Sequence, residues 1–290
     1  MSPRVSFGET SLNWGSFKKF LQGNCCERVV KDRVRYAKKY GHCLFKRDFG
    51  ELTTFSDSKR SHVLKALSGL AKFLGIYEDF KGLVKAYGLT WKTASADDLI
   101  ISRLTKANEN NDVIEWIGKV RKKFPELNVF VDFVLVSGLR YVESVKAFNL
   151  IVDLAKEGRL SEYYNAETEA LEHFRFKQLF IRRTKKAFIS FIPKSFIQRV
   201  SNQKNLTTYQ ISNSIKRNGF KSRFSDVREY YATFMTKWLS QPEIDFLQGR
   251  VSANVFMRNY FNPALITDLK ERTFKAMNEI RQKSSCTVQS

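Results

Sequence analysis

The chain has few of the residues that mark secreted or membrane proteins. Its 290 residues include four cysteines, none in a CxxC pair, and two of them are the adjacent Cys25 and Cys26. A disulfide framework would be unusual at this length, so we interpret the cysteines as small core residues or exposed thiols in a reducing compartment. No run of about 20 apolar residues indicates a membrane span, and segment 1–15 lacks the apolar centre of a signal peptide. We therefore expect a cytoplasmic protein with no membrane partner.

Histidine is also scarce, with three in the chain. His42 and His62 have no ligand partners at metal-binding spacing, so we interpret them as surface or core residues. The chain has no carboxylate cluster suited to a two-metal site, and it has no glycine-rich loop that would hold a cofactor. We expect no cofactor and no metal requirement for catalysis.

Acidic residues are too few to balance the basic ones. The chain has 50 Lys and Arg against 29 Asp and Glu, a net charge of +21. Such an excess predicts attraction to a polyanion, with nucleic acid as the first candidate. A heat-adapted surface is the alternative, but the acidic half of its ion-pair networks is missing. An apolar content of 43% with 25 Phe indicates a globular chain, long enough for two domains.

The sequence predicts a mainly α fold of α+β class in two domains. Residues 1–98 read as a helical DNA-binding domain, and residues 99–290 as a mostly helical domain with a small antiparallel sheet. The boundary falls in the polar stretch 97–112, which suits a linker or a linker helix. Segment 59–74 shows an apolar stripe closed by Gly75. Its Lys and Arg residues lie off that stripe, where they could face DNA or simply solvent.

Two patterns stand out in the first half of the second domain. The apolar segment 127–136 is interrupted at Gly138, which can end one helix and begin another with Arg140 at the junction. An ion pair between Arg140 and Glu143, one helical turn away, is the simple structural explanation. Further on, segment 174–193 gives the clearest β signal, with aromatic and β-branched runs on either side of Arg-Arg-Thr-Lys-Lys. It predicts a hairpin with a basic tip.

The stretch 224–263 predicts three successive short helices. Apolar residues recur at helical spacing in its first part, with Arg228 near the start. Ser240 and Glu243 form a capping-box pattern that begins the second helix.

Gly249 suits the end of that second helix, and Arg250 follows it directly. A third short helix would carry Tyr260 at its end, between polar residues and an Asn-Pro pair that suggest a place near the surface. Two arginines and a tyrosine on successive short helices can converge on a phosphate.

These residues, taken in order, resemble the catalytic domain of tyrosine recombinases, the integrase family. SGLRYVES is similar to the first-arginine box of the family, SDVREYYATFM to the second, and QGRVSANVFMRNYFNP to the final box with its nucleophile. The pattern is closest to integrases and transposases of archaeal viruses and mobile elements, and it covers roughly residues 26–263. The catalytic set that the resemblance implies is Arg140, Lys185, Arg228, Arg250 and Tyr260.

The chain departs from the family pattern at two positions. Ser225 stands three residues before Arg228, where the family has a basic residue, and Arg250 follows Gly249 in place of His or Trp. All three histidines fall outside these boxes. A hairpin lysine and Arg250 would therefore carry more of the proton transfer.

The resemblance implies DNA cutting and rejoining through a covalent 3′-phosphotyrosine, as in site-specific recombination or integration. Arg140 and Arg228 have the planar, always charged guanidinium that suits a phosphate clamp, and Tyr260 would be the nucleophile. Lys185 is preferred to Lys186 as the general acid on the leaving oxygen. The neighbouring tyrosines at 230 and 231 lie on an apolar face and are better explained by core packing.

Double-stranded DNA is thus the expected partner, and the family implies a tetramer on two DNA sites. The predicted C-terminal helix, residues 264–282, could dock on a neighbouring subunit or pack on its own domain. Three other functions use the same observations. A transposase or a type IB topoisomerase would share the chemistry, whereas a catalytically inactive DNA-binding accessory protein would explain the missing histidines.

Overall fold

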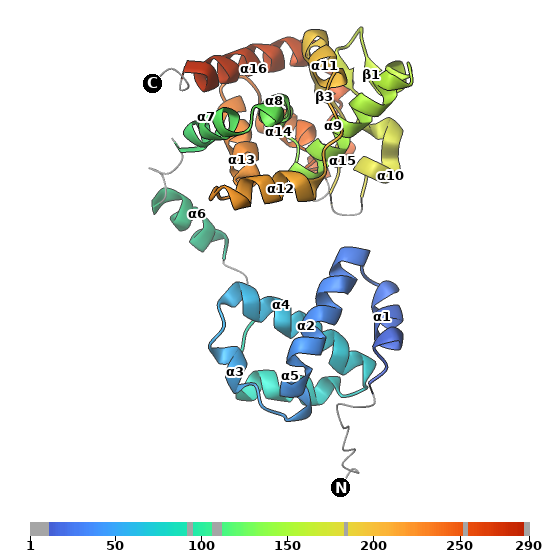
Figure 1. Cartoon of the computed structure of the whole chain (residues 1–290), viewed down its shortest axis with the longest axis vertical. Coiled ribbons are helices and arrows are strands. Elements are labelled where there is room, and N and C mark those ends of the chain that lie inside the picture. Colours follow the sequence, from blue (N-terminus) through green and yellow to red (C-terminus); the bar gives the residue numbers. More distant parts are fainter. Residues whose placement is uncertain (1–11, 92–94, 106–111, 183–184, 252–254, 287–290) are drawn as a thin grey trace. The chain divides into compact units, whose positions relative to one another are not determined.

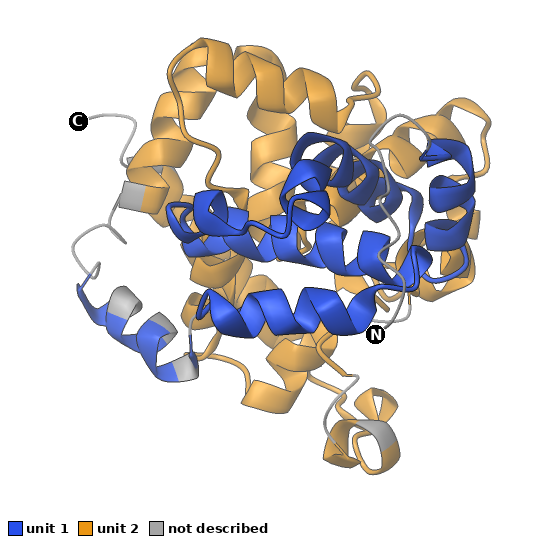
Figure 2. Ribbon diagram, turned by 90° about the horizontal axis from the view of Figure 1, so that it is seen from below, with its two compact units in different colours: residues 1–105 blue, residues 106–290 orange. Residues whose placement is uncertain are grey.

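The computed structural model describes residues 12–91, 95–105, 112–182, 185–251 and 255–286. The chain divides into two compact units, residues 1–105 and 106–290 (Figure 2). The described residues are mostly helical, and their strands form one small antiparallel sheet (Figure 1). The predicted fold class is therefore confirmed. No helix within the described ranges combines the length and the apolar composition needed to cross a membrane.

The first unit is entirely helical in its described residues. Its helices are α1 (Trp14–Gln22), α2 (Glu27–Phe45), α3 (Gly50–Thr53), α4 (Asp57–Phe73), α5 (Tyr77–Ala86) and α6 (Ala96–Thr105). Helix α2 packs most extensively against α4. The apolar stripe predicted for 59–74 is buried in this contact, because Val63, Leu64 and Leu67 are fully enclosed. Gly75 follows the helix with φ of 74°, as its predicted capping role requires.

The second unit surrounds a central apolar helix. Its α-helices are α7 (Asp112–Lys123), α8 (Asn128–Ser137), α9 (Tyr141–Lys156), α10 (Lys177–Phe180), α11 (Lys194–Ser201), α12 (Thr208–Arg217), α13 (Phe224–Met235), α14 (Gln241–Leu247), α15 (Val255–Asn259) and α16 (Leu269–Cys286). Short 3₁₀ turns are η3 (Pro125–Leu127), η4 (Leu160–Glu162), η5 (His173–Phe176) and η6 (Pro263–Leu265). The central element is α8, most of whose residues are buried.

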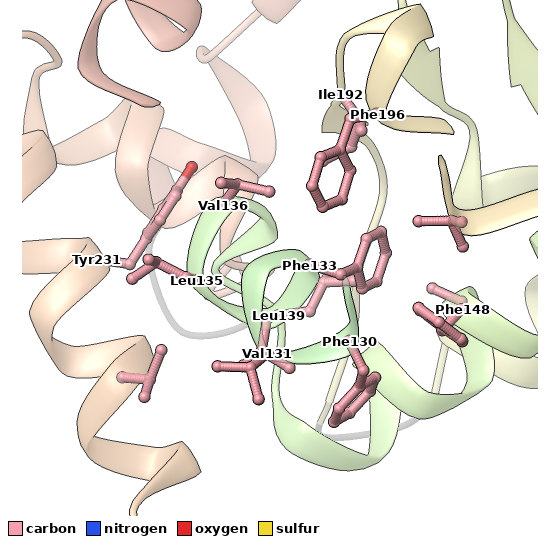
Figure 3. Packing of buried hydrophobic residues seen from close by; sticks show 14 of the residues in the cluster. Phe130, Val131, Phe133, Leu135, Val136, Leu139, Phe148, Ile192, Phe196 and Tyr231 are labelled. Atoms are coloured by element: carbon pink, nitrogen blue, oxygen red, sulfur yellow. The ribbon is translucent and has the colours of Figure 1, made fainter. Parts of the chain in front are cut away.

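Aromatic rings hold α8 in place from several sides. Phe130 and Phe133 on α8 contact Phe148 on α9 at ring-centroid distances of 5.5 and 5.9 Å, both nearly edge to face (Figure 3). Phe196 on α11 stacks on Phe133 from another side. Each buried aromatic side chain removes a large apolar area from water, so this cluster supplies much of the stability of the unit. The junction after α8 is therefore anchored in a dense core.

The sheet differs from the predicted hairpin. It contains β1 (Tyr164–Asn165), β2 (Ala170–Leu171) and β3 (Ser190–Phe191) in the order β1-β2-β3, all antiparallel. Most of the first run of the predicted hairpin, which begins at Phe174, is instead helical, in η5 and α10. Phe176, Leu179 and Phe180 explain the error, because their spacing of three and four places them on one side of a helical turn that faces the core.

The C-terminal helix α16 packs on its own unit. It contacts α7, α8 and α13, and Leu269, Ala276, Met277 and Ile280 are buried there. Of the two roles that the sequence left open for this segment, the structure shows packing within the unit. The apolar face of α16 is buried against other helices of the second unit.

Candidate active site

Arg140 stands at the junction between α8 and α9, where the sequence placed it. Gly138 ends α8 with φ of 60°, and a Cβ at this position would lie 2.5 Å from the Tyr231 ring. Arg140 is the N-cap residue of α9, so its side chain leaves the helix at its beginning. Its Nη1 donates to Glu143 Oε2 at 3.1 Å, which confirms the predicted ion pair, and to the carbonyl oxygen of Lys186 at 3.2 Å.

Glu143 is fully buried and has two arginine partners. Its Oε2 accepts from Arg140, and its Oε1 accepts from Nη2 of Arg182 at 2.9 Å. A buried carboxylate costs free energy unless it is paired, and here both oxygens are occupied. Glu143 therefore orients two guanidinium groups. One is that of Arg140 at the α8–α9 junction, and the other is that of Arg182 in the turn that also carries Lys185 and Lys186, called the basic turn below.

Arg228 on α13 is buried with an exposure of 8%. Its Nη1 donates to the carbonyl oxygen of Gly138 at 2.6 Å, and its Nη2 donates to that of Gln248 at 2.7 Å. Gln248 returns a bond from Nε2 to the carbonyl oxygen of Arg228 at 3.0 Å. The side chain thus connects the end of α8 with the end of α14.

The positive charges around Arg228 are close enough to affect one another. Burial, followed by the charges of Arg140 and Arg250, lowers the pKa of Arg228 to about 9, and Glu143 opposes this shift. The positive charges of Arg140 and Arg250 therefore disfavour the charged form of Arg228, and the negative charge of Glu143 partly offsets their effect. An anion bound between them would relieve this repulsion, which is the electrostatic condition for a phosphate site.

Arg250 is positioned by the end of α14. The predicted capping box of Ser240 and Glu243 is present at the start of this helix, and Gly249 follows its end with φ of 66°. The backbone N–H of Arg250 donates to the carbonyl oxygen of Asp245 at 2.7 Å. The Arg250 side chain is 45% exposed, and its Nη1 lies 3.8 Å from Asp245 Oδ1. It is therefore the most accessible of the three arginines.

The basic turn contacts both arginine segments through its backbone. Ile181 and Lys186 form an antiparallel bridge, and the N–H of Arg182 donates to the carbonyl oxygen of Lys185 at 2.9 Å. A Cβ on Gly249 would lie 1.7 Å from the carbonyl oxygen of Lys186. The Lys186 backbone thus lies between the Arg140 guanidinium and the Gly249 turn. Glycine is required at 249 both for its conformation and for this close approach.

The two candidate lysines differ in exposure. Lys185 is exposed and Lys186 is half-buried. Both follow the turn at 182, whose remaining residues 183–184 lie outside the described residues.

Tyr260 lies beside this cluster in sequence but is not bonded to it. It follows the last residue of α15, its N–H donates to the carbonyl oxygen of Phe256 at 2.9 Å, and its side chain is 74% exposed. The next residue, Phe261, packs on Phe246 of α14, which stacks on Phe188 just beyond the basic turn. Within the described part of the chain, no hydrogen bond joins the Tyr260 hydroxyl to an arginine.

The neighbouring tyrosines are part of the core, as the sequence suggested. Tyr231 is 2% exposed and lies against the α8 junction (Figure 3), and burial raises the pKa of its hydroxyl. Tyr230 is half-buried and stacks on Phe234, and burial raises its pKa as well. Both hydroxyls are harder to ionise than a phenol in water.

The remaining polar residues near the boxes have structural partners. The Ser225 hydroxyl donates to the carboxylate of its neighbour Asp226 at 3.1 Å. His173 is fully buried, with Nδ1 2.7 Å from the Tyr163 hydroxyl and Nε2 2.9 Å from the Ser190 hydroxyl. Burial lowers the pKa of His173 to about 3, so it stays neutral and supports the fold near β3.

Sequence reasoning missed two residues of this arrangement. Arg182 was only one of four positive charges at a predicted turn, and no local signal links it to Glu143, 39 residues away. Gln248 was not singled out, although its backbone and side chain both bond to Arg228. Both contacts depend on the folded chain and leave no pattern in the sequence.

Residues 105–275 match the family model described as archaeal phage integrase. This span covers more than half of the 290 residues and includes every residue discussed above for the site. No curated protein and no solved structure matches the chain.

Proposed function

The chain belongs to the archaeal phage integrase family, and on this basis we propose that it cuts and rejoins DNA through a covalent 3′-phosphotyrosine. The observation that carries the proposal is the arginine cluster. Arg228 donates to the carbonyl oxygens of Gly138 and Gln248, each two residues before another arginine, Arg140 and Arg250. Burial, and then the charges of these two arginines, lower the pKa of Arg228. Such a site is suited to a phosphodiester whose transition state gains negative charge on its non-bridging oxygens.

In this mechanism Arg140 and Arg228 bind the scissile phosphate. Arg228 is fixed by two carbonyl groups and Arg140 by Glu143, so neither has to reorganise when charge develops. Preorganised donors of this kind are usually the largest single contribution to catalysis, with about 10²–10³-fold in rate for one donor. Arg250, which is more exposed, supplies a third donor or helps the phenol to lose its proton.

Tyr260 is the proposed nucleophile. The exposed phenol loses its proton to water, its oxygen attacks phosphorus and the bond to the 5′ oxygen breaks. That oxygen leaves with a proton from Lys185 or, as the alternative, Lys186. The phosphotyrosine keeps the energy of the phosphodiester bond, so rejoining needs no ATP. The exposed Tyr260 has to approach the phosphate when DNA is bound, and hydrogen bonds of catalytic groups often form only in the substrate complex.

We propose that the first unit binds DNA and that the protein acts as a tetramer on two sites. On α4, Lys65 and Lys72 are exposed and available to phosphates. Arg60 is different, because its guanidinium donates to the carbonyl oxygens of Leu52, Thr53 and Phe55 and so supports the turn after α3. Contacts with phosphates should make the affinity strongly dependent on salt.

Three other functions remain testable. A transposase or a type IB topoisomerase would use the same residues, and an assay for strand exchange against simple relaxation of DNA would separate these related enzymes. An inactive accessory protein is favoured by two observations. No histidine lies in the boxes, and among the described residues no hydrogen bond joins the Tyr260 hydroxyl to an arginine. Such a protein would bind DNA without forming a covalent complex.

The decisive experiment traps the covalent complex on a nicked suicide duplex that carries the recombination site, without added divalent cation. Wild type should give a band of higher mass on a denaturing gel, and Tyr260→Phe should abolish it. Tyr209→Phe is the matched control, because Tyr209 is equally exposed at 73% and should leave the band intact.

A band that survives Tyr260→Phe would assign the nucleophile to another tyrosine. DNA binding without a band in wild type would favour the accessory function and contradict the enzymatic proposal. Electrophoretic mobility shifts on the same duplex measure binding in each variant, so that loss of chemistry is distinguished from loss of affinity.

A further inference from the structure

Three side chains with metal-binding atoms meet in the first unit, far in sequence from the integrase boxes. His42 and Cys43 lie near the end of α2, and Glu51 lies on α3. His42 Nε2 is 3.2 Å from Glu51 Oε2 and 3.4 Å from Cys43 Sγ, and Cys43 Sγ is 3.8 Å from the same Glu51 oxygen. One atom from each residue therefore forms a closed triangle. The sequence spacing gave no metal partner for His42, and the fold provides two.

The turn between the two helices brings Glu51 to this position. After α2 the chain reverses, with Arg47 in the left-handed region at φ of 55° and the N–H of Asp48 donating to the carbonyl oxygen of Cys43 at 3.0 Å. Asp48 then accepts from the N–H of Gly50 at 2.8 Å, which begins α3. The backbone itself therefore sets the distance between Glu51 and the end of α2.

The size of the triangle matches a tetrahedral zinc ion. With bonds of about 2.0–2.3 Å to N, O and S, tetrahedral geometry places ligand atoms roughly 3.3–3.6 Å apart. The three observed distances of 3.2, 3.4 and 3.8 Å lie around these values. Only small side-chain movements would be needed to place an ion above the triangle.

The chemistry and charge of the three groups also suit zinc. Thiolate and imidazole ligands favour zinc over Mg²⁺ or Ca²⁺, which prefer oxygen. One thiolate and one carboxylate supply two negative charges, which a divalent ion neutralises. A zinc ion binds cysteine as the thiolate, so metal binding at this cluster releases the Cys43 proton.

We propose that His42, Cys43 and Glu51 form a zinc site that fastens α3 to the end of α2. The site is open on one side, because the His42 and Glu51 side chains are 37% and 48% exposed, and a water molecule takes the fourth position. Among the described residues, the ligand atoms that lie within 4.8 Å of one another come from His42, Cys43 and Glu51 alone. The site joins α2 to α3 in the first unit, and it is independent of the phosphotyrosine chemistry proposed for the second unit.

The test uses the full chain and cobalt(II) as a spectroscopic probe, followed by competition with zinc. Wild type should bind one Co²⁺ with a thiolate charge-transfer band and the visible bands of a tetrahedral complex, and zinc should remove both. Glu51→Gln and His42→Ala change exposed side chains and should keep the fold, yet each should weaken zinc binding by more than about tenfold, roughly 1.4 kcal/mol. Cys43→Ser should abolish the charge-transfer band.

Cys26→Ser is the matched control, because Cys26 is an exposed free thiol in the same unit. It should leave the cobalt spectrum and the zinc affinity unchanged. Zinc should also raise the melting temperature of wild type but not of Glu51→Gln, because an ion that binds only the folded state stabilises it. A charge-transfer band that persists in Cys43→Ser, or equal zinc affinity in wild type and Glu51→Gln, would overturn the proposal and leave the cluster as a hydrogen-bonded contact.

Discussion

In the second unit, the guanidinium of Arg228 and the hydroxyl of Tyr260 are constrained to very different degrees. Arg228 is 8% exposed and donates to two carbonyl groups that lie 90 and 20 residues away in sequence. Tyr260 is 74% exposed and is positioned through its backbone and through the neighbouring Phe261. The proposed phosphate-binding residues are thus built into the fold, whereas the proposed nucleophile is presented at its surface.

This difference agrees with the chemistry proposed for the two groups. Stabilising charge in a transition state works best when donors are fixed beforehand, because no free energy is then lost in reorienting them. A nucleophile that forms a covalent bond with DNA has to approach the phosphate and later release it. We infer that the arginine cluster determines where the phosphate binds and that the Tyr260 segment adjusts to it.

Arg228→Lys should have the largest effect on the cleavage rate, and Arg250→Lys is the variant with which it is compared. Lysine keeps the charge but cannot reach both carbonyl groups with a planar fork, and a buried acceptor left without a donor costs about 1–3 kcal/mol. We expect single-turnover cleavage to fall by about 10²–10³-fold for Arg228→Lys. Arg250 is 45% exposed with a 3.8 Å ion pair, so Arg250→Lys should cost about tenfold or less, in keeping with weak exposed pairs.

Cleavage rates on the nicked duplex at saturating protein measure this difference, and circular dichroism confirms that both variants fold. If both substitutions reduced the rate equally, burial would not distinguish the two arginines, and the comparison would fail.

The next effect concerns the close approach between Gly249 and the basic turn. Gly249→Ala places a Cβ 1.7 Å from the carbonyl oxygen of Lys186, and this contact is with backbone that cannot rotate away. Gly219→Ala is the matched control, because Gly219 has a similar φ of 77° and nothing within 4 Å of its added Cβ. The left-handed conformation costs both variants about 1–2 kcal/mol. Overpacking should cost Gly249→Ala a further ~1–3 kcal/mol.

Chemical denaturation of the two variants measures the difference in the free energy of unfolding. Equal destabilisation would mean that the turn moves freely away from Gly249. That result would contradict the rigid contact on which the position of Lys186 depends.

The features of the site that were predictable from the sequence are those with a local cause. Gly138 and Gly249 adopt the left-handed conformations that their places after helices suggested, and Ser240 and Glu243 form the expected capping box. Each signal depends on residues within about one helical turn, so the sequence carries it directly. The roles of the candidate catalytic residues stay predictions, because the geometry brings the arginines together without showing a reaction.

The features that were missed depend on contacts between distant residues or on very short elements. Strands β1 and β2 have two residues each, too few to show alternation. Arg228 finds its acceptor at Gly138 across 90 residues, and His42 meets Glu51 through a turn whose geometry no spacing rule describes. The segment that begins at Phe174 was read as a strand because aromatic residues are enriched in strands, but packing against the core favours helical turns there.

The smallest expected effect is that of Arg182→Gln, which removes the link between the basic turn and buried Glu143. This ion pair is short at 2.9 Å, but Arg182 is 40% exposed and Glu143 keeps Arg140 as a partner. Discounted for solvent screening, the loss should be about 0.5–1 kcal/mol, a few-fold decrease in cleavage rate. Arg199→Gln is the matched control, because Arg199 is 45% exposed and pairs with Asp132 at 3.4 Å, so it removes the same charge elsewhere.

The position of the lysines explains why Arg182→Gln should affect one chemical step in particular. A duplex with sulfur as the 5′ leaving atom needs no general acid, because a thiolate leaves without a proton. If Arg182 positions the turn that carries the general acid, Arg182→Gln should therefore reduce the cleavage rate less on this duplex than on the normal one. Lys185→Ala should be rescued by the same substrate, or Lys186→Ala if the acid is the other lysine. An Arg182→Gln defect that is equal on both substrates, or equal to that of Arg199→Gln, would show that Arg182 contributes charge alone and does not position the general acid.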